Sequence, residues 1–419
     1  MKRLLSVSLL MTVFLLGCET KPQEGEKNSS ASSTSSTVSS SATNSSSTSS
    51  TVSSSSTTSS ATSSSLSSSS TSSTGGGQAS FVPLFISCGG YTTFVLDTNG
   101  MVWATGYNSE GQLGKGDNKD TNSFVIVASN VKSVACSGIH TFIIKNDNTL
   151  WATGDNSAGQ LGTGNKKDTN SFLMVESNVK AVSCGNFDNH HTFIIKNDDT
   201  LWGTGDNNRG ELGTNISTTS FVMIANNVKK VVCGAYNTFI IKNDDTLWAT
   251  GYNYYGQLGT NIYPNSFVMV ASNVKAVACG LNHTCIIKND DTLWAAGDNY
   301  YGQLGTGNYN NTTSFVLVES NVRSVACGEN YTIIIKNDNT LWATGNDNSG
   351  QFGIGYKNKT NSFIMLTSNV KEVACGRYHT LIIKENDTLW ATGANNKGQL
   401  GIGKNIGNTN SFVEITITY

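Results

Sequence analysis

The chain has 419 residues, a formal net charge of −2 at pH 7 and only 13% charged residues. A chain with so little charge has no basic field of the kind that nucleic-acid binding needs, so nucleic acid is excluded as an expected partner. It also contains no acidic tract, and its function therefore has to be sought in its motifs.

The first 18 residues form a predicted export signal. A short basic segment, M-K-R, precedes an apolar run from Leu4 to Leu16, and a run of about a dozen residues is too short to span a bilayer. The run ends in L-L-G-C, which resembles the lipobox of bacterial lipoproteins and implies cleavage before Cys18 and lipid attachment to its sulfur. We therefore expect a lipoprotein signal peptide over residues 1–18 and a protein lipid-anchored in the bacterial cell envelope, at the outer membrane or cell surface. An ordinary signal peptide that contains a Cys is the alternative.

Residues 19–80 are predicted to be a disordered Ser/Thr-rich linker. From Asn28 to about Ser80 the chain is almost wholly Ser and Thr, and it offers little more than Val38, Val52 and Leu66 to a core. Such a segment cannot offset the entropy of its own ordering. As a flexible coil of about 50 residues it would span roughly 40 Å, which suits a tether above a membrane. The more specific alternative is a stalk that carries glycans on its Ser and Thr residues.

Residues 81–419 repeat one pattern seven times, with a period of about 48 residues that is typical of stacked supersecondary units. The pattern carries one Trp in each repeat: Trp103, Trp151, Trp202, Trp248, Trp294, Trp342 and Trp390. It also carries one Cys in each repeat: Cys88, Cys136, Cys184, Cys233, Cys279, Cys327 and Cys375.

Each repeat contains four short segments typical of strands, such as V-K-S-V-A-C, T-F-I-I-K, L-W-A-T and the stretch from Ser171 to Val175. Turn signals rich in Asn, Asp and Gly separate them, and these residues tolerate the left-handed backbone of tight hairpins. Four strands in each of seven repeats predict an all-β, seven-bladed β-propeller. The sequence leaves open whether a blade coincides with one repeat. If it straddles two, the segment from Phe81 to Cys88 and the strand from Ser411 to Ile417 would help close the ring.

The nine cysteines predict buried thiols rather than a disulfide framework. Seven of them occupy one repeated strand position on different blades, which we expect to be too far apart to bridge. Cys279 and Cys285 flank one hairpin loop, and an oxidising compartment would permit a bond between them. Because Cys285 stands where other repeats have Phe142 or Phe239, core filling is the favoured interpretation.

The recurring strings C-G-x-x-H-T, L-W-A-T-G and G-x-N-x-x-G-Q-L-G resemble those of the regulator of chromosome condensation (RCC1) repeat family, from about Phe81 onward. The resemblance implies a seven-bladed propeller. It does not fix the function, because the family includes a nuclear guanine-nucleotide exchange factor, a plant ultraviolet receptor and a secreted bacterial inhibitor of β-lactamases.

Alternating strands place the C-G-x-x-H-T and N-x-x-G-Q-L-G loops on one face, where aromatic residues vary between repeats, and the near-identical K-N-D tips on the other. Exposed Tyr is enriched in binding hot spots. The longest loop, in the third repeat, is expected to project outward and to place Phe187 near Tyr236, with Tyr91, Arg377 and Tyr378 around the same central opening. The predicted partner-binding residues are Tyr91, Phe187, Asp188, Tyr236, Tyr254, Tyr255, Tyr300, Tyr301, Arg377 and Tyr378. The alternative is that these aromatic residues only pack loops onto neighbouring blades.

No catalytic residue, metal ligand or cofactor is predicted. His140, His191, His283 and His379 share one repeat position that Thr92, Asn237 and Tyr331 fill elsewhere, which favours a structural hydrogen-bonding role. The K-N-D-D-T tips lack the ligand spacing of an EF-hand, and no nucleophile-elbow, zincin or phosphate-loop string occurs. The Trp residues lie within strands, not in the loops where a light receptor would need them.

We therefore expect a monomeric, lipid-anchored propeller that binds an unknown protein or glycan partner and contacts the membrane through lipid on Cys18. An enzyme inhibitor that resembles the β-lactamase-binding relative is the second hypothesis. A guanine-nucleotide exchange factor is the third, and export would separate it from cytosolic GTPases.

Overall fold

The structure is a computed structural model, and it describes residues 81–185, 187, 189–356, 358–403 and 406–418. The predicted signal peptide with Cys18, the linker at residues 19–80 and the predicted site residue Asp188 lie outside the described residues. None of the described residues belongs to an apolar helix of membrane-spanning length.

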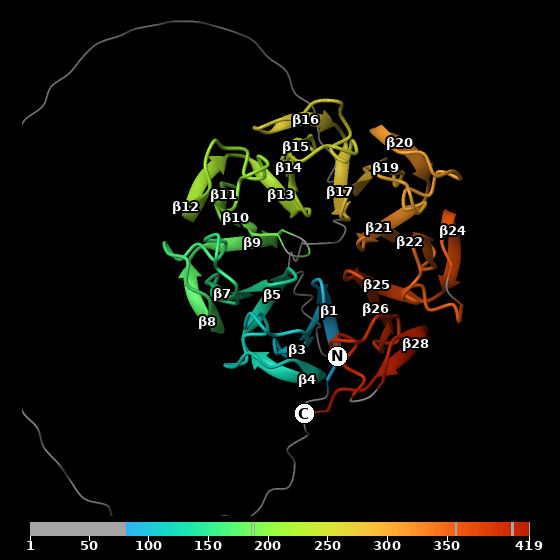
Figure 1. The fold of residues 1–419 in the computed structure, drawn as a ribbon, viewed down its shortest axis with the longest axis horizontal. Coiled ribbons are helices and arrows are strands. Elements are labelled where there is room, and N and C mark those ends of the chain that lie inside the picture. Colours follow the sequence, from blue (N-terminus) through green and yellow to red (C-terminus); the bar gives the residue numbers. More distant parts are fainter. Residues whose placement is uncertain (1–80, 186, 188, 357, 404–405, 419) are drawn as a thin grey trace, which may run out of the picture. The chain divides into compact units, whose positions relative to one another are not determined.

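The described residues form seven four-stranded antiparallel sheets, each built from strands that follow one another in the chain (Figure 1). The first sheet contains β1 (Pro83–Cys88), β2 (Thr92–Asp97), β3 (Val102–Gly106) and β4 (Thr121–Ala128). The other six sheets contain, in chain order, β5 (Val131–Cys136), β6 (His140–Lys145), β7 (Leu150–Gly154), β8 (Thr169–Glu176), β9 (Val179–Cys184), β10 (His191–Lys196), β11 (Leu201–Gly205), β12 (Thr218–Ala225), β13 (Val228–Cys233), β14 (Asn237–Lys242), β15 (Leu247–Gly251), β16 (Val268–Ala271), β17 (Val274–Cys279), β18 (His283–Lys288), β19 (Leu293–Gly297), β20 (Thr312–Glu319), β21 (Val322–Cys327), β22 (Tyr331–Lys336), β23 (Leu341–Gly345), β24 (Thr360–Thr367), β25 (Val370–Cys375), β26 (His379–Lys384), β27 (Leu389–Gly393) and β28 (Thr409–Ile415). The predicted seven-bladed β-propeller is confirmed.

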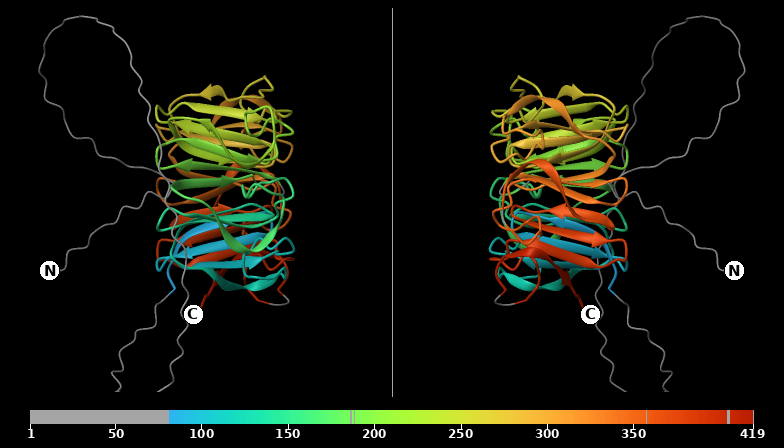
Figure 2. Two further views of the ribbon diagram at one scale, coloured as in Figure 1. Left: turned by 90° about the vertical axis from the view of Figure 1, so that its left-hand side faces the viewer. Right: turned by 90° about the vertical axis from the view of Figure 1, so that its right-hand side faces the viewer.

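The innermost strand of every blade is the one that ends in the repeated Cys. These strands contact one another around the ring, and β1 of the first blade contacts β25 of the last (Figure 1). The strands that end each blade, from β4 to β28, lie at the circumference, and all strands run between the two faces of the ring (Figure 2). A blade therefore coincides with one repeat, and packing of β1 on β25 closes the ring without a sheet that mixes the two ends of the described chain.

The hydrophobic core lies between blades. The cluster that contains Phe94 and Leu96 of the first blade also contains Val131, Val134 and Ile143 of the second, and the same pairing of neighbours recurs around the ring. The second strand of each blade is buried along almost its whole length. This burial explains why its T-F-I-I-K sequence is a continuous apolar run rather than an alternating one.

The turn residues adopt the backbone that the sequence predicts. In the turns between blades, Asn130, Asn178 and Asn227 have φ values of 57° to 58°, and in the hairpin tips Asn148 and Asp199 have φ values of 66° and 64°. Asn and Asp are the non-glycine residues that best tolerate this left-handed region. The tight connections between strands therefore follow from these short polar side chains.

Two repeated hydrogen bonds join neighbouring blades. The Thr hydroxyl of L-W-A-T donates to a Gly carbonyl of the preceding blade, as Thr153 does to Gly111 at 2.8 Å. The His of C-G-x-x-H-T hydrogen-bonds through Nε2 to a Thr hydroxyl of the next blade, as His140 does to Thr192 at 3.1 Å. The same bond joins His191 to Thr238, His283 to Thr332 and His379 to Thr93. The structural role predicted for these four histidines is confirmed.

Candidate partner-binding face

The two faces of the propeller differ in how far their residues vary between blades. We call the surface formed by the C-G-x-x-H-T and N-x-x-G-[QE]-[LF]-G loops the loop face. We call the surface formed by the K-N-D hairpin tips and the S-N turns the tip face. Every predicted binding residue that the structure describes belongs to a loop of the loop face.

The tip face is nearly the same in six of the seven blades. A Lys at the end of the second strand lies over the Trp ring of the third strand, with Nζ 4.0 Å from the centroid for Lys145 on Trp151 and 4.6 Å for Lys384 on Trp390. The Trp Nε1–H of these blades donates to a Thr hydroxyl in the adjoining tip, as in Trp151 to Thr149 at 2.9 Å. In these six blades the Lys is thus engaged by a cation–π contact and the Trp by a hydrogen bond, both within the blade itself.

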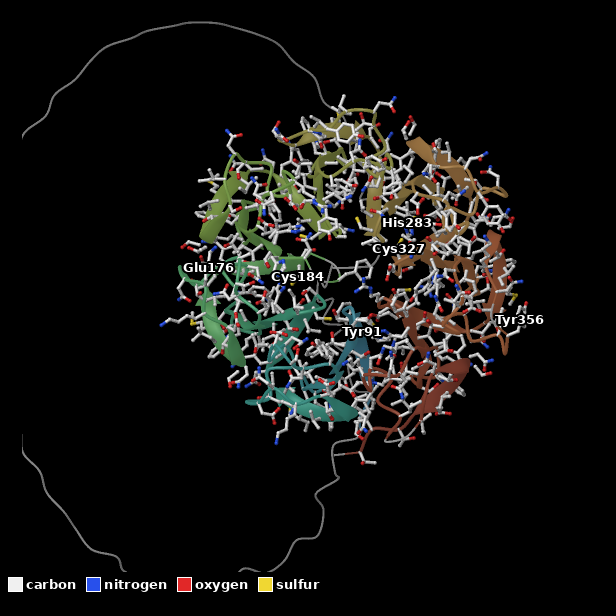
Figure 3. All side chains as sticks on the ribbon, in the orientation of Figure 1. Tyr91, Glu176, Cys184, His283, Cys327 and Tyr356 are labelled. Carbon is white, nitrogen blue, oxygen red and sulfur yellow. The ribbon has the colours of Figure 1, made fainter. Side chains whose placement is uncertain are left out.

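At the centre of the loop face, five side chains form what we call the central cluster: Tyr91, Phe187, Glu329, Arg377 and Tyr378. Arg377 Nε donates to Glu329 Oε2 at 2.6 Å, and its guanidinium lies 5.7 to 5.8 Å from the rings of Tyr91, Phe187 and Tyr378. The rings of Tyr91 and Tyr378 lie 6.2 Å apart. Figure 3 shows Tyr91 near the middle of the ring, whereas Glu176 and Tyr356 lie at the rim.

Burial and Glu329 together set the charge states of this cluster. Burial lowers the pKa of Arg377, but its hydrogen bond to Glu329 more than offsets that effect and leaves the pKa above its ordinary value. Burial raises the pKa of Tyr378, and the neighbouring carboxylate raises it further. The cluster therefore presents a guanidinium already neutralised by a partner, and a Tyr378 phenol that stays protonated.

The loops around the central cluster also hold one another through backbone hydrogen bonds. The amide of Arg377 donates to Gly90, that of Glu329 to Arg377, and that of Leu281 to Glu329, at 3.2, 3.3 and 3.0 Å. On the other side, the amide of Gly138 donates to Phe187 at 2.5 Å. These bonds join the loops of the fifth, sixth, seventh and first blades in one series and those of the second and third blades in another, so the loops at the centre of the loop face hold one another in place.

Phe187 corrects one prediction. Its side chain is only 6% exposed and lies against the central cluster, with the backbone in the left-handed region at φ 61°. The expectation that this loop projects outward is wrong at Phe187, which packs over the middle of the ring. In this position the Phe187 ring contacts the central cluster, and the Phe187 carbonyl accepts a hydrogen bond from the Gly138 amide. In an outward loop the ring and the amide would instead face solvent.

A second group, the arginine–tyrosine patch, comprises Arg209, Tyr236, Tyr252, Tyr254 and Tyr255 on the third and fourth blades. The guanidinium of Arg209 lies 3.7 Å from the ring centroid of Tyr236 and 4.7 Å from that of Tyr252. Tyr252 stacks on Tyr254 at 6.4 Å, and Tyr254 meets Tyr255 edge-on at 5.0 Å. Tyr254 is nevertheless 67% exposed. The patch thus offers aromatic faces in a fixed arrangement to solvent.

A groove beside this patch extends it. Arg209 and Tyr252 line the groove together with Tyr263, Pro264 and Asn265, and its volume is about 390 Å³. Tyr263 is exposed as well. Aromatic walls and amide-bearing side chains next to a cation are the composition that protein interfaces favour.

The loop that carries Tyr254 and Tyr255 is pinned from below by a buried Asn. Asn253 Oδ1 accepts from the amide of Leu258 at 2.9 Å, and its Nδ2 donates to the carbonyls of Thr260 and Ile262, each at 2.6 Å. The corresponding Asn207 makes equivalent bonds below Arg209. The repeat pattern therefore supplies a rigid frame, and the variable positions between its fixed residues supply the exposed side chains.

The fifth blade contributes a third group. Tyr300 and Tyr301 meet edge-on at 4.9 Å, and Lys359 of the next blade lies 5.5 Å from Tyr300 and 4.7 Å from Tyr309. Tyr300 is 67% exposed. The structure thus divides the predicted residues into three groups. Tyr236 belongs to the patch and is not among the residues that contact Phe187 in the central cluster.

Three charged residues that hold these groups together, Arg209, Glu329 and Lys359, are not among the predicted site residues. Other repeats also carry charge at these positions, with Glu110 and Lys397 at that of Arg209, Asp120 and Asp168 at that of Lys359, and Arg377 at that of Glu329. A comparison of the repeats for charge would therefore have marked these variable positions but not the three residues in particular.

The central channel below the loop face is lined by thiols. The repeated Cys of all seven blades lines one cavity together with Glu372 and the apolar side chains of the innermost strands. No cysteine that the structure describes forms a disulfide, which includes Cys279 and Cys285. Burial raises the pKa of Cys136, Cys233 and Cys375 to about 12, so these thiols stay protonated at neutral pH.

Family models match most of the described chain. A model for the RCC1-like domain matches residues 65–315, and models for the regulator of chromosome condensation (RCC1) repeat match residues 322–351 and 370–399, and 338–383. No curated protein matches the chain in sequence.

Solved structures with the same fold are distant in sequence. Human WBSCR16 is 19% identical, with a TM-score of 0.67 over 76% of this chain and 94% of that one. Prp20p from Saccharomyces cerevisiae, in a study of its binding to Gsp1p and histones, is 19% identical, with a TM-score of 0.69 over 77% and 87%. Yeast RCC1 (Prp20) bound to Kap60 gives 18% identity and a TM-score of 0.69 over 83% and 91%. At this level of identity the likeness concerns the fold.

Proposed function

The chain belongs to the RCC1-like domain family, and on this premise we propose that its propeller is a protein-binding module whose contact surface is the loop face. The arginine–tyrosine patch is the main contact and the central cluster is its neighbour. The observation that carries the proposal is the difference between the two faces. The variable side chains, the exposed tyrosines and the groove all lie on the loop face, whereas the tip face repeats one internally paired motif.

A protein partner suits this surface better than other classes. Tyrosines that are rigidly held yet exposed lose little conformational entropy on binding, and Arg stacked on Tyr can still donate hydrogen bonds to a partner's carbonyls or carboxylates. Prp20p, which shares the fold, binds Gsp1p and histones, both proteins. A glycan remains the alternative partner, because aromatic faces also stack on sugar rings.

The proposal also covers location. The sequence of residues 1–18 supports export and lipid attachment at Cys18, and the Ser/Thr-rich residues up to 80 support a tether that holds the propeller away from the membrane. In this arrangement the protein displays a binding face in the cell envelope. A captured enzyme would make inhibition the consequence of binding, and a captured GTPase would make nucleotide exchange the consequence.

Site-specific photocrosslinking tests the proposal. A photoreactive phenylalanine analogue replaces Tyr254 on the loop face of the full-length protein, and the matched control places it at the exposed Asp198 on the tip face. We expect crosslinked protein partners from position 254 and none from position 198. Crosslinks from position 198 alone would overturn the proposal. Carbohydrate crosslinked at position 254 would show that the partner is a glycan and not a protein.

A further inference from the structure

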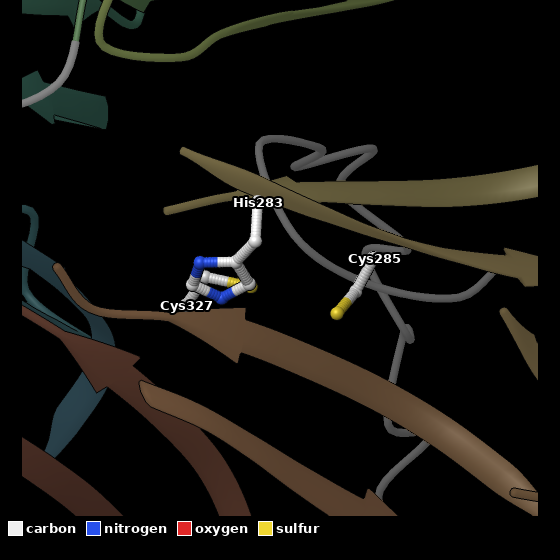
Figure 4. Close-up of side chains that lie close together, drawn as sticks. All are labelled: His283, Cys285 and Cys327. Atoms are coloured by element: carbon white, nitrogen blue, oxygen red, sulfur yellow. The ribbon is translucent and has the colours of Figure 1, made fainter. Parts of the chain in front are cut away.

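The interface between the fifth and sixth blades contains a cluster of metal-ligating side chains that the repeat pattern does not produce elsewhere in the sequence. His283 and Cys285 lie two residues apart on β18 and therefore point to the same side of the strand. Cys327, at the end of β21 in the next blade, faces them (Figure 4). The ligand atoms of the three residues all lie within 4.8 Å of one another, and all three side chains are buried.

A fourth donor completes the cluster. The hydroxyl of Thr332, which pairs with Cys327 across β21 and β22, lies 3.0 Å from Nε2 of His283, 3.7 Å from Sγ of Cys285 and 3.9 Å from Sγ of Cys327. Its hydrogen is directed to the carbonyl of Gln303 at 2.8 Å, which leaves its lone pairs for the other side. One oxygen, one nitrogen and two sulfurs thus surround a common point.

The spacing suits a tetrahedral ion. Zinc binds sulfur at about 2.3 Å and nitrogen or oxygen at about 2.0–2.2 Å, so its ligand atoms stand about 3.3–3.8 Å apart. The separations of the other three ligand atoms from the Thr332 hydroxyl oxygen, 3.0 to 3.9 Å, lie within a few tenths of an ångström of that range. Small side-chain movements would therefore suffice to bind the ion.

The imidazole of His283 can present Nε2 to an ion by a change of tautomer. In the second and third blades, Nδ1 of the equivalent histidine is held by Ser137 or Asn189, at 2.8 and 2.9 Å. Nδ1 of His283 has no hydrogen-bond partner among the residues that the structure describes. Because the Thr332 hydroxyl donates to Gln303, Nε2 of His283 carries the ring hydrogen in the metal-free site. Metal binding therefore requires the other tautomer, and the hydrogen can move to Nδ1 without breaking a bond there.

We propose that His283, Cys285, Cys327 and Thr332 form a structural site for a thiophilic divalent cation of the zinc class that joins the fifth and sixth blades. Binding converts two thiols to thiolates and releases two protons. The two thiolates balance the charge of the ion, so the buried site is neutral overall, as burial requires. Thiolate and imidazole donors favour zinc over the oxygen-seeking ions of calcium or magnesium type.

The repeats supply conservative variants for the test. Cys285→Phe introduces the residue that stands at this position as Phe94, Phe142, Phe193 and Phe239. His283→Asn introduces the residue that the fourth blade has as Asn237. The matched control is Cys184→Ala, which removes an equivalent channel thiol whose blade has no second cysteine. Each variant is checked for folding by circular dichroism and gel filtration before metal is added.

The experiment titrates the reduced, metal-free full-length protein with Zn²⁺ and with Co²⁺, whose absorption reports tetrahedral thiolate coordination. We expect one ion per chain, a thiolate-to-cobalt band and a higher Tm with zinc. Cys285→Phe and His283→Asn should bind at least about tenfold more weakly, and Cys184→Ala should bind as the wild type does. Equal binding by Cys285→Phe, loss of binding in Cys184→Ala, or a Cys285–Cys327 disulfide that replaces the bound ion would each overturn the proposal.

Discussion

Glu372 illustrates how one residue can depart from the repeat without breaking it. It lies on β25, at a position of the innermost strand that is Ser133, Ala181 or Lys230 in other blades. Its carboxyl group accepts a hydrogen bond of 3.1 Å from the amide of Ile86 on β1. Burial raises its pKa to about 8, and neither this hydrogen bond nor the nearby cations offset the effect. The protonated carboxyl thus helps to close the ring.

This pKa predicts a pH-dependent stability. The folded protein keeps a proton that the unfolded chain, with its ordinary pKa of 4.5, releases, so the free energy of unfolding falls as pH rises between 4.5 and about 8. The buried histidines, whose pKa values are lowered, act in the opposite direction below about pH 7.5, and the buried Lys230, whose pKa falls to about 8, does so at the alkaline end. In the window from pH 6.5 to about 8, the difference between the wild type and a Glu372→Gln variant therefore isolates the contribution of Glu372.

We predict that Glu372→Gln removes most of the stability loss in that window. Urea unfolding at several pH values measures the free energy of unfolding. The contribution of Glu372 is expected to be up to about 1.4 kcal/mol per unit of difference between its folded and unfolded pKa values. Retention of the full pH dependence by the Gln variant would show that another group is responsible.

At the scale of strands and turns, the sequence predicts the number, order and limits of the elements well. Apolar runs flanked by Asn, Asp and Gly leave little choice for where each strand begins and ends. The Asn and Asp turns adopt the expected left-handed backbone. It does not predict which strand is innermost, because V-K-S-V-A-C and the stretch from Ser171 to Val175 have similar apolar content. Packing between blades decides this: Leu173 and Met174 of β8 remain exposed, whereas Val134 and Cys136 of β5 are buried.

The histidine bond between blades predicts a clear stability effect. His140→Ala removes a buried bond of 3.1 Å and leaves the Thr192 hydroxyl without this partner, so the free energy of unfolding should fall by about 1–3 kcal/mol. Chemical denaturation of the full-length protein measures it.

The matched control is His190→Ala, which removes a half-buried residue whose Nε2 lies 3.3 Å from Asp155 on the loop face. We expect a loss below about 1 kcal/mol for this variant. Equal losses in the two variants would contradict a special role for the repeated His position.

For the whole molecule, the sequence identifies the variable face and correctly places Phe187 with Tyr91, Arg377 and Tyr378 around its centre, but it does not predict the group around Arg209. Tyr91 of the first blade meets Arg377 and Tyr378 of the last, and ring closure brings these two ends of the repeat domain together. Phe187 illustrates the limit of sequence reasoning. An insertion in a loop is free to project or to fold back, and only the contacts with neighbouring blades determine which occurs.

The proposed membrane anchor makes a prediction for the whole chain. Cys18→Ala should release the protein from the membrane fraction or leave it unprocessed, because the thiol is the expected lipid attachment point. Fractionation and mass spectrometry of the N-terminus measure both outcomes. If the variant is cleaved at the same bond and still partitions with membranes, the lipoprotein prediction is wrong.

The affinity of the crosslinked partner for variants of the two faces tests the central claim most directly. Truncation of an aromatic or Arg anchor at an interface typically costs about 2 kcal/mol or more, so Arg209→Ala and Tyr254→Ala should each raise Kd at least about tenfold while leaving the Tm close to that of the wild type. Asp198→Ala, an exposed change on the tip face, should leave Kd unchanged. A Kd that rises with Asp198→Ala and is unaffected by the two loop-face variants would contradict the assignment of the binding face.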